Sequence, residues 1–311
     1  MKTAQLLNYA LDRWTPGEGN LAEISSAIDG APVATTGSGG LDFAGMLNHA
    51  REVGGPALRK MTFHERARML KALGQAILAR KEELYELNYL TGATRKDGWI
   101  DIEGGAGTLF SFSSKGRREL PDAHVLMDGA IEPLSKTGSF VGQHIYTPLQ
   151  GAALHINAFN FPVWGMLEKL APTLLAGVPA IVKPASSTAY LAEAAFRVMI
   201  ESGVLPTGAV QLIVGGVGNL FDHLGGQDVV SFTGSASTAL KLRTHPTVMR
   251  ESVKFIAEQD SLNASLLGPD AAPGTPEFDL FVREVAIEVT VKAGQKCTAI
   301  RRAMAPAEHL D

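Results

Sequence analysis

The stretch GAALHINAFNFPVWGMLEKLAPTLLAGVPAIVKPAS, residues 151–186, shows the pattern on which the fold class depends. An apolar run at 152–156 is followed by an amphipathic segment at 163–175 and by a second apolar run at 180–182. Short apolar runs joined by one helix are typical of a βαβ unit, whose crossover makes the two strands parallel. The sequence therefore predicts an α/β fold built on a parallel sheet.

The same alternation continues toward the C-terminus. Three more strands are expected, at 210–214, 229–232 and 253–256. Helices are expected before each of these strands, at 188–202, 219–224 and 236–242. Five apolar runs joined by helices predict a parallel, Rossmann-like sheet with helices on both faces. Ligands of such a sheet bind outside the carboxyl ends of its strands, so the loops after the runs are where we expect a site.

Other patterns flank this core. Helical periodicity covers 63–90, and the Gly/Thr/Ser-rich stretch 30–42 is expected to be a loop. A further helix is predicted at 276–291, where apolar residues recur on one face. Gly294 would stop this helix just before the only cysteine of the chain, Cys297.

Composition narrows the class of function. The formal net charge of −4 comes without a basic cluster of the size that nucleic acids require, and no apolar stretch is long enough for a membrane span. One cysteine excludes an internal disulfide, and the N-terminal residues lack a secretory pattern, so we expect a cytoplasmic protein. No set of potential ligands has metal-site spacing, so no metal is expected. A small molecule is the expected partner.

Two polar residues follow the first two expected strands. Asn160 has an amide that could donate to a developing oxyanion, although it could equally cap the helix that follows Pro162. Lys183 would place its ammonium at a strand end, where ribose or phosphate oxygens could lie, unless it is an ordinary surface lysine.

Glycines follow two later strands. Gly234 and Ser235 lie between a strand and a helix, where backbone N–H groups could bind a pyrophosphate. The glycine-rich loop 215–218 does not match the spacing Gly-x-Gly-x-x-Gly, and is more typical of a turn.

Cys297 is the candidate nucleophile. A lone cysteine is more often a small buried apolar residue. Here cationic neighbours favour a thiolate, namely Lys296, Arg301 and Arg302.

Three residues are candidates for the general base. Glu258 lies at the end of the last expected strand, where its carboxylate could accept a proton, and Asp260 is its rival. His155 lies inside an apolar run and is more typical of a buried core histidine.

The order of these motifs resembles the aldehyde dehydrogenase superfamily across nearly the whole chain. Asn-Phe-Pro (160–162), Lys-Pro-Ala (183–185), Phe-Thr-Gly-Ser (232–235), a strand-end Glu and Gly-Gln-Lys-Cys (294–297) follow one another. Longer phrases, such as those at 155–162, 164–172, 227–230 and 293–302, are similar to the dehydrogenase half of the bifunctional proteins of phenylacetate degradation. That group and its relatives in benzoyl-CoA breakdown oxidise semialdehydes carried on coenzyme A.

The resemblance implies a role for each matching residue. Cys297 would be the nucleophile, Glu258 the base that activates the hydrolytic water, and Asn160 the oxyanion donor. The cofactor, NADP or NAD, would be bound by residues at the strand ends, namely Ile156, Phe159, Lys183, Ser186, Gly234 and Ser235. The reaction implied is NAD(P)-dependent oxidation of an aldehyde, one linked to coenzyme A, to a carboxylic acid.

Two positions depart from the family pattern. Many members have Glu where this chain has Ser186, and the loss of that carboxylate favours acceptance of the 2′-phosphate of NADP, unless Ser186 only starts a helix. The second glycine of the family's Gly-x-Thr-x-x-Gly is replaced by Ala239, which puts close helix packing there in doubt.

The resemblance also sets the expected domain limits. Residues 1–256 would form the dinucleotide-binding domain with its N-terminal helices, and 137–150 would form a hairpin used in a homo-oligomer. Residues 257–311 would be the N-terminal part of a catalytic domain, incomplete because the chain ends 14 residues after Cys297. Two other functions stay open: a dinucleotide-binding fragment without activity, and a cysteine hydrolase or acyltransferase that pairs Cys297 with His155.

Overall fold

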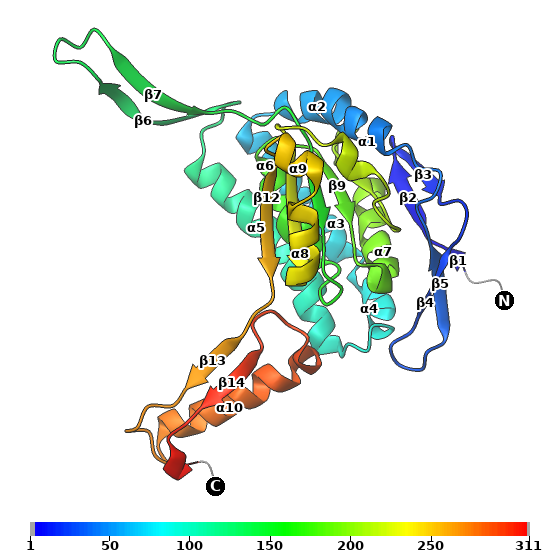
Figure 1. The fold of residues 1–311 in the computed structure, drawn as a ribbon, viewed down its shortest axis with the longest axis vertical. Helices are drawn as coiled ribbons and strands as arrows, with labels where there is room; N and C mark the ends of the chain where they lie inside the picture. The colour runs from blue at the N-terminus through cyan, green and yellow to red at the C-terminus, as the bar shows by residue number, and fades with distance from the viewer. Residues whose placement is uncertain (1–3, 310–311) are drawn as a thin grey trace.

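The computed structural model describes residues 4–309 and has a seven-stranded sheet at its centre (Figure 1). The strand order is β12-β11-β8-β9-β10-β2-β3, and the first five run parallel. These five are the predicted strands, with bounds β8 Ala153–Ile156, β9 Ala180–Lys183, β10 Val210–Leu212, β11 Val229–Gly234 and β12 Lys254–Gln259. The predicted parallel Rossmann-like sheet is confirmed.

Helices cover both faces of the sheet, as predicted. On one face lie α6 (Trp164–Leu175) and α7 (Ala189–Glu201). Helices α3 (Phe63–Ala79) and α5 (Arg95–Glu119) pack against these helices and complete the larger core. The other face packs against α1 (Phe43–His49), the 3-10 helix η3 (Leu220–His223), α8 (Ala236–Arg243) and α9 (Pro246–Arg250). Short helical segments complete the layers, namely η1 (Ala50–Gly54), α2 (Gly55–Arg59), α4 (Lys81–Tyr89) and η2 (Ser186–Thr188).

The N-terminus adds strands that the sequence did not indicate. Strand β2 (Leu7–Ala10) pairs antiparallel with β10, and β3 (Arg13–Pro16) extends the edge. The stretch 30–42, expected to be a loop, contains β5 (Pro32–Thr36), which pairs with β1 (Ala4–Gln5) and β4 (Ala22–Ser25). The expectation was wrong because Gly, Ser and Thr disfavour regular structure only locally, whereas pairing with distant strands stabilises this one.

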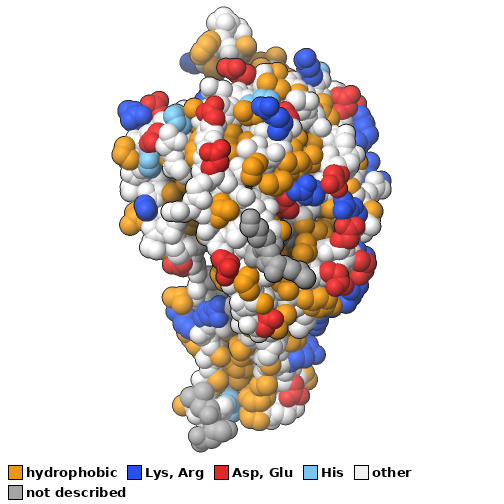
Figure 2. All heavy atoms as spheres, turned by 90° about the vertical axis from the view of Figure 1, so that its right-hand side faces the viewer, with side chains coloured by type: hydrophobic (Ala, Val, Ile, Leu, Met, Phe, Trp, Pro, Cys, Tyr) orange, Lys and Arg blue, Asp and Glu red, His pale blue; other side chains and the backbone are white. Residues whose placement is uncertain are grey.

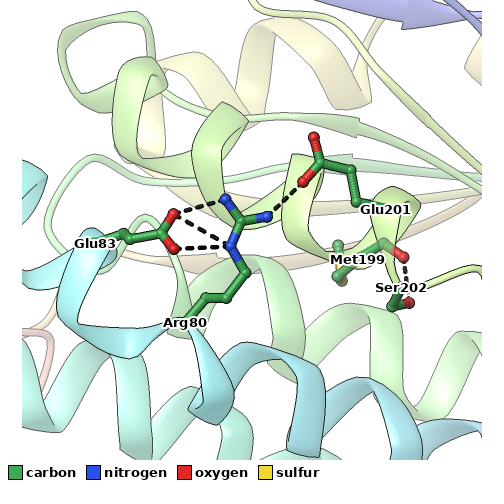
Figure 3. A network of polar contacts seen from close by, with 5 residues as sticks. All are labelled: Arg80, Glu83, Met199, Glu201 and Ser202. Carbon is green, nitrogen blue, oxygen red and sulfur yellow. Dashed lines mark hydrogen bonds and ion pairs between the residues drawn. The ribbon is translucent and has the colours of Figure 1, made fainter.

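The helical stretch 63–90 forms two helices that meet at Arg80. The first begins with a capping box of Thr62 and Glu65. At the junction, the Arg80 guanidinium donates to Glu83 and to Glu201 on α7 (Figure 3). These side chains are exposed, so the contacts contribute little to the stability of the fold.

The C-terminal part forms a separate lobe (Figure 1). It contains parallel strands β13 (Asn263–Leu266) and β14 (Ile300–Met304), joined through α10 (Pro276–Thr290) and η4 (Val291–Gly294), with η5 (Ala307–His309) at its end. This is the expected start of a second α/β unit. The boundary expected at 256 lies inside β12, which ends at Gln259.

A two-stranded ribbon projects from the body of the molecule (Figure 1). Its strands are β6 (Leu126–Pro133) and β7 (Val141–Tyr146), so the hairpin begins earlier than the expected range 137–150. Acidic and basic side chains are interspersed over the face seen in Figure 2, which agrees with the small net charge. Among the described residues, no helix combines the length and the apolar character that crossing a bilayer needs.

Candidate active site

The carboxyl ends of the parallel strands meet along one edge of the sheet. Thr233 on β11 lies opposite Glu258 on β12, and Ile156 on β8 lies opposite Lys183 on β9. The loops that carry the predicted site residues therefore leave the sheet side by side, as the parallel topology requires.

Cys297 lies in the loop between η4 and β14, and it is exposed. Its carbonyl oxygen accepts hydrogen bonds from the Ser261 hydroxyl, at 2.6 Å, and from the Asn263 amide. On the other side, the backbone N–H of Lys292 donates to the Asp97 carboxylate on α5 at 3.0 Å. The cysteine loop is thus attached both to its own lobe and to the first domain.

Two cavities meet at Cys297. The first has a volume of about 280 Å³ and opens toward α6, and the second has about 510 Å³ and opens toward the strand ends. Both are lined by Ala158, Asn160, Thr233, Glu258, Lys296, Cys297 and Thr298. The structure therefore brings together the three residues that the sequence nominated for catalysis, between two separate routes of approach.

The predicted thiolate at Cys297 is not supported by its surroundings. Partial burial raises the pKa of the Cys297 thiol, and a hydrogen bond to Glu258 and its negative charge raise this pKa further. The cationic neighbours have other partners: Lys296 pairs with Glu288 at 2.7 Å, while Arg301 and Arg302 donate to the carbonyl oxygens of Gly294 and Leu262. Residues that are neighbours in the sequence need not face the same way, and these cations bond elsewhere than to the thiol. The surroundings of Cys297 therefore favour its protonated form, with Glu258 beside it.

Asn160 does not cap the helix that follows it. Helix α6 has Val163 at its N-cap and no side-chain cap hydrogen bond. The Asn160 amide instead donates to the carbonyl oxygen of Gln295 at 2.9 Å, which connects the loop after β8 to the cysteine loop. Its NH₂ group carries a second N–H, which is available to a ligand in the cavities that it lines.

Asp260 lines the second cavity with Cys297, but its carboxylate already has a hydrogen-bond partner. Its carboxylate accepts a hydrogen bond from the backbone N–H of Ala236 at 3.2 Å, at the beginning of α8. Of the two candidate bases, Glu258 is therefore the one placed beside the thiol.

The residues nominated for a dinucleotide lie along the same edge of the sheet. Phe159 and Gly234 line the second cavity, and Ser186 is exposed at the start of η2 without a side-chain cap hydrogen bond. Burial lowers the pKa of Lys183 at the end of β9. The side chain of Ile156 is packed in the core, so only its backbone could face a cofactor.

The N-terminus of α8 is the place where a pyrophosphate would bind. Strand β11 ends at Gly234, and Ser235 caps α8 by accepting from the N–H of Thr238. An anion bound at this helix terminus would replace the Asp260 carboxylate as the acceptor for Ala236. Ala239, which stands in for the family's second glycine, is 1% exposed, so its methyl group is accommodated without loss of the helix packing. The residues present fit a dinucleotide.

Two motifs have structural roles. His155 is buried, bonds to the Thr173 hydroxyl at 3.1 Å, and lines neither cavity that contains Cys297. Desolvation lowers its pKa to about 3, so it is a neutral core histidine and not a partner for the cysteine. In the glycine loop, a Cβ added to Gly215 would lie 2.5 Å from the backbone nitrogen of Ser38, so this residue serves close packing.

The sequence did not single out the α6 side of the site. Lys169 donates to the Thr233 hydroxyl at 2.7 Å, and Trp164, Gly165 and Glu168 line the first cavity with it. Phe161, Trp164, Gly165, Glu168 and Lys169 recur at intervals of three or four residues, which places them on one face of a helix. That spacing could have indicated that they line the site together.

Comparison with known proteins places these features in a family. The model of the "Aldehyde dehydrogenase family" matches residues 14–311. The 3,4-dehydroadipyl-CoA semialdehyde dehydrogenase of Aromatoleum evansii is 46% identical over 304 residues, which are 97% of this chain and 59% of the relative. The α-ketoglutarate semialdehyde dehydrogenase of Haloferax volcanii is 30% identical over 77% of this chain and 47% of its own. This chain thus spans three fifths or less of the length of these relatives.

Solved structures share the fold at low identity. Betaine aldehyde dehydrogenase of Staphylococcus aureus, in complex with NAD+, has a TM-score of 0.84 at 21% identity, over 98% of this chain and 59% of that one. NADP-dependent glyceraldehyde-3-phosphate dehydrogenase of Bacillus halodurans, in complex with NADP, has a TM-score of 0.83 at 21% identity, over 99% and 62%.

Proposed function

The chain belongs to the aldehyde dehydrogenase family, and from that premise we propose that it carries out NAD(P)-dependent oxidation of an aldehyde to a carboxylic acid. The observation that supports this most directly is that Cys297, Glu258 and Asn160 line both cavities. A nucleophile, a base and an amide donor are the groups that acyl transfer through a thioester requires.

The substrate proposed is a semialdehyde linked to coenzyme A. The name of the Aromatoleum relative describes such a compound, and the phrases around Asn160 and Cys297 led to the same expectation, with aromatic degradation as the setting. The first cavity suits the hydrocarbon part of that substrate, because Ile100, Phe161 and Trp164 contribute to its wall.

In the first half of the reaction, Cys297 becomes nucleophilic next to Glu258. The thiol loses its proton to water in the open cavity, and the sulfur then attacks the aldehyde carbon. The second N–H of the Asn160 amide donates to the oxygen that becomes negatively charged. Bound NAD(P)+ would accept the hydride, which leaves a thioester on Cys297.

In the second half, water cleaves the thioester. Glu258 lines both cavities and removes a proton from this water, so that the acid is released and the thiol is restored. We assign the main role of Glu258 to this step.

The cofactor is proposed to lie across the carboxyl edge of the sheet, in the second cavity. Lys183 and Ser186 would contact the adenosine ribose, and Gly234 and Ser235 the pyrophosphate. Phe159 and the backbone of Ile156 would line its path. A protein that depends on one free thiol also suits a reducing compartment, so we propose the cytoplasm.

The test compares three substitutions. Cys297→Ala should abolish NAD(P)H formation, whereas Glu258→Gln should leave a rapid burst followed by slow steady turnover, since the base acts mainly in hydrolysis. Stopped-flow absorbance of NAD(P)H measures both phases. Glu251→Gln, the same change at a carboxylate outside both cavities, is the matched control and should keep both burst and steady turnover. Full activity of Cys297→Ala would refute the mechanism, and equal loss of burst and steady rate in Glu258→Gln would move Glu258 to the acylation step.

A further inference from the structure

Gly165 leaves an open space in the wall of the first cavity. It lies in the first turn of α6, where its N–H donates to the carbonyl oxygen of Phe161 at 2.8 Å, and it lines the cavity that contains Cys297. A Cβ built on Gly165 would meet no atom within 4 Å. The room that a side chain would occupy here therefore belongs to the cavity.

The helix cannot shift to fill that room, because its beginning is held against α5. A Cβ on Gly104 would lie 3.1 Å from the Trp164 ring, and a Cβ on Gly105 would lie 3.0 Å from the Trp164 Cα. The buried Asp101 carboxylate also accepts the N–H of Trp164 at 2.8 Å. Close packing and this hydrogen bond fix the position of Gly165.

The chemistry of the wall indicates what the space admits. Ile100, Phe161, Trp164 and Val291 supply apolar surface, while Glu168, Lys169 and Lys296 supply polar groups. Such a lining suits a hydrocarbon chain that continues into a polar group, rather than a small aldehyde that would leave the space unfilled.

We propose that Gly165 determines substrate size: its missing side chain admits aldehydes on a medium-length acyl chain to Cys297 from the α6 side. The inference rests on the proposed function for the identity of the reaction, but not for the shape of the cavity. A larger residue at this position would restrict Cys297 to short substrates.

The test measures access to Cys297 without requiring turnover. Iodoacetamide and N-hexyl iodoacetamide are reacted with the 311-residue chain, and the modification of Cys297 is followed by mass spectrometry. Gly165→Leu should slow the reaction with the hexyl reagent by about tenfold or more, a typical effect of added hydrocarbon volume in an apolar pocket, and leave iodoacetamide nearly unaffected. Gly165→Ala should shift the ratio in the same direction but less.

Gly107→Leu is the matched control. It lies on α5, outside both cavities, and a Cβ there would also meet nothing within 4 Å. Its reagent ratio should equal that of the unmodified protein. Equal slowing with both reagents in Gly165→Leu, or no slowing with either, would overturn the proposal.

Turnover separates this inference from the proposed function. In a parallel assay, kcat/KM is measured for propanal and for a C8 aldehyde. If Gly165→Leu loses the longer substrate selectively, both proposals are supported. If no aldehyde is oxidised while labelling stays size-selective, the proposed function fails and the assignment of Gly165 stands.

Discussion

Ser186 lies at the position where the family often has glutamate, exposed at the first residue of η2. A carboxylate there would repel a 2′-phosphate, whereas serine can donate a hydrogen bond to it. Lys183 contributes a positive charge three residues earlier. A charge-assisted contact to phosphate contributes about 1.5–3 kcal/mol, enough to make this single residue decide which cofactor binds.

We therefore predict that NADP binds at least as tightly as NAD, and that Ser186→Glu weakens NADP by about tenfold or more while sparing NAD. Calorimetric titration of both cofactors into both proteins measures this. Ser187→Glu, the same change at the next exposed serine, is the control and should leave the preference unaltered. Unchanged NADP affinity in Ser186→Glu would show that the 2′-phosphate lies elsewhere.

His155 makes the stability of the fold sensitive to acid. Its pKa is lowered from 6.5 to about 3, first by desolvation and then by the charge of Lys169. Between these values the unfolded chain binds a proton that the folded chain does not. The stabilisation by neutral His155 is thus complete above pH 6.5 and is lost as the pH falls toward 3, at up to about 1.4 kcal/mol per pH unit.

Replacing His155 with glutamine should remove this dependence. Between pH 7 and pH 5 we expect the natural protein to lose about 2 kcal/mol more free energy of unfolding than His155→Gln, measured by urea denaturation. Burial raises the pKa of Asp101 to about 6, which gives the opposite slope, but Asp101 is common to both proteins and cancels in the comparison. His144→Gln, on the exposed hairpin, is the control. Parallel pH profiles for His155→Gln and the natural protein would contradict the prediction.

Among the elements, helix α5 organises the site from a distance. Asp97 holds the left-handed turn at Lys292, where φ is 53°, and Asp101 accepts the N–H groups of Val163 and Trp164 at the start of α6. One helix thus positions both the cysteine loop and the wall of the first cavity. Its glycines permit this, because they let α6 approach closely.

Substitution of Gly105 would show how closely α5 and α6 must pack. A Cβ there would lie 3.0 Å from the Trp164 Cα and 3.3 Å from a Leu167 methyl group, so Gly105→Ala should lower the free energy of unfolding by about 1–3 kcal/mol through overpacking. Gly107→Ala lies on the same helix with open space around it, and should be stabilising by about 0.5–1 kcal/mol. Urea denaturation of both variants gives the comparison. Equal stability of the two would show that the helices can separate without cost.

At the scale of the whole molecule, the β6–β7 ribbon exposes apolar side chains that no other part of the chain covers in the described residues. Its apolar side chains are exposed, with Phe140 at 63%, Ile131 at 59% and Ile145 at 54%. An isolated two-stranded hairpin is marginally stable in water, so a partner surface is expected. We propose that this surface belongs to a second copy of the chain.

The prediction is that Ile131→Glu, or Phe140→Glu, lowers the oligomeric state toward the monomer. Sedimentation velocity measures the change directly. Ile28→Glu replaces an isoleucine that is 65% exposed in the turn between β4 and β5, and should leave the assembly intact. An unchanged sedimentation profile for both hairpin variants would place the contact elsewhere.

Much of the architecture could be predicted from local pattern. The alternation from 152 to 256 predicted five parallel strands and the helices between them, since apolar periodicity reflects which face of each element is buried. The edge at which ligands bind followed from parallel topology. The motifs around Asn160, Glu258 and Cys297, taken in their order, resembled the family whose model matches the chain. These inferences needed only residue types and their order along the chain.

Contacts between distant segments decided the rest. Strand β5 exists because β1 and β4 pair with it. The pKa of the Cys297 thiol is raised because the thiol is partly buried beside Glu258, while Lys296 pairs with Glu288. The open space at Gly165 depends on where α5 holds α6. Pairing, electrostatic environment and cavity shape are set by groups brought together through space, and neither composition nor spacing along the chain specifies which groups will meet.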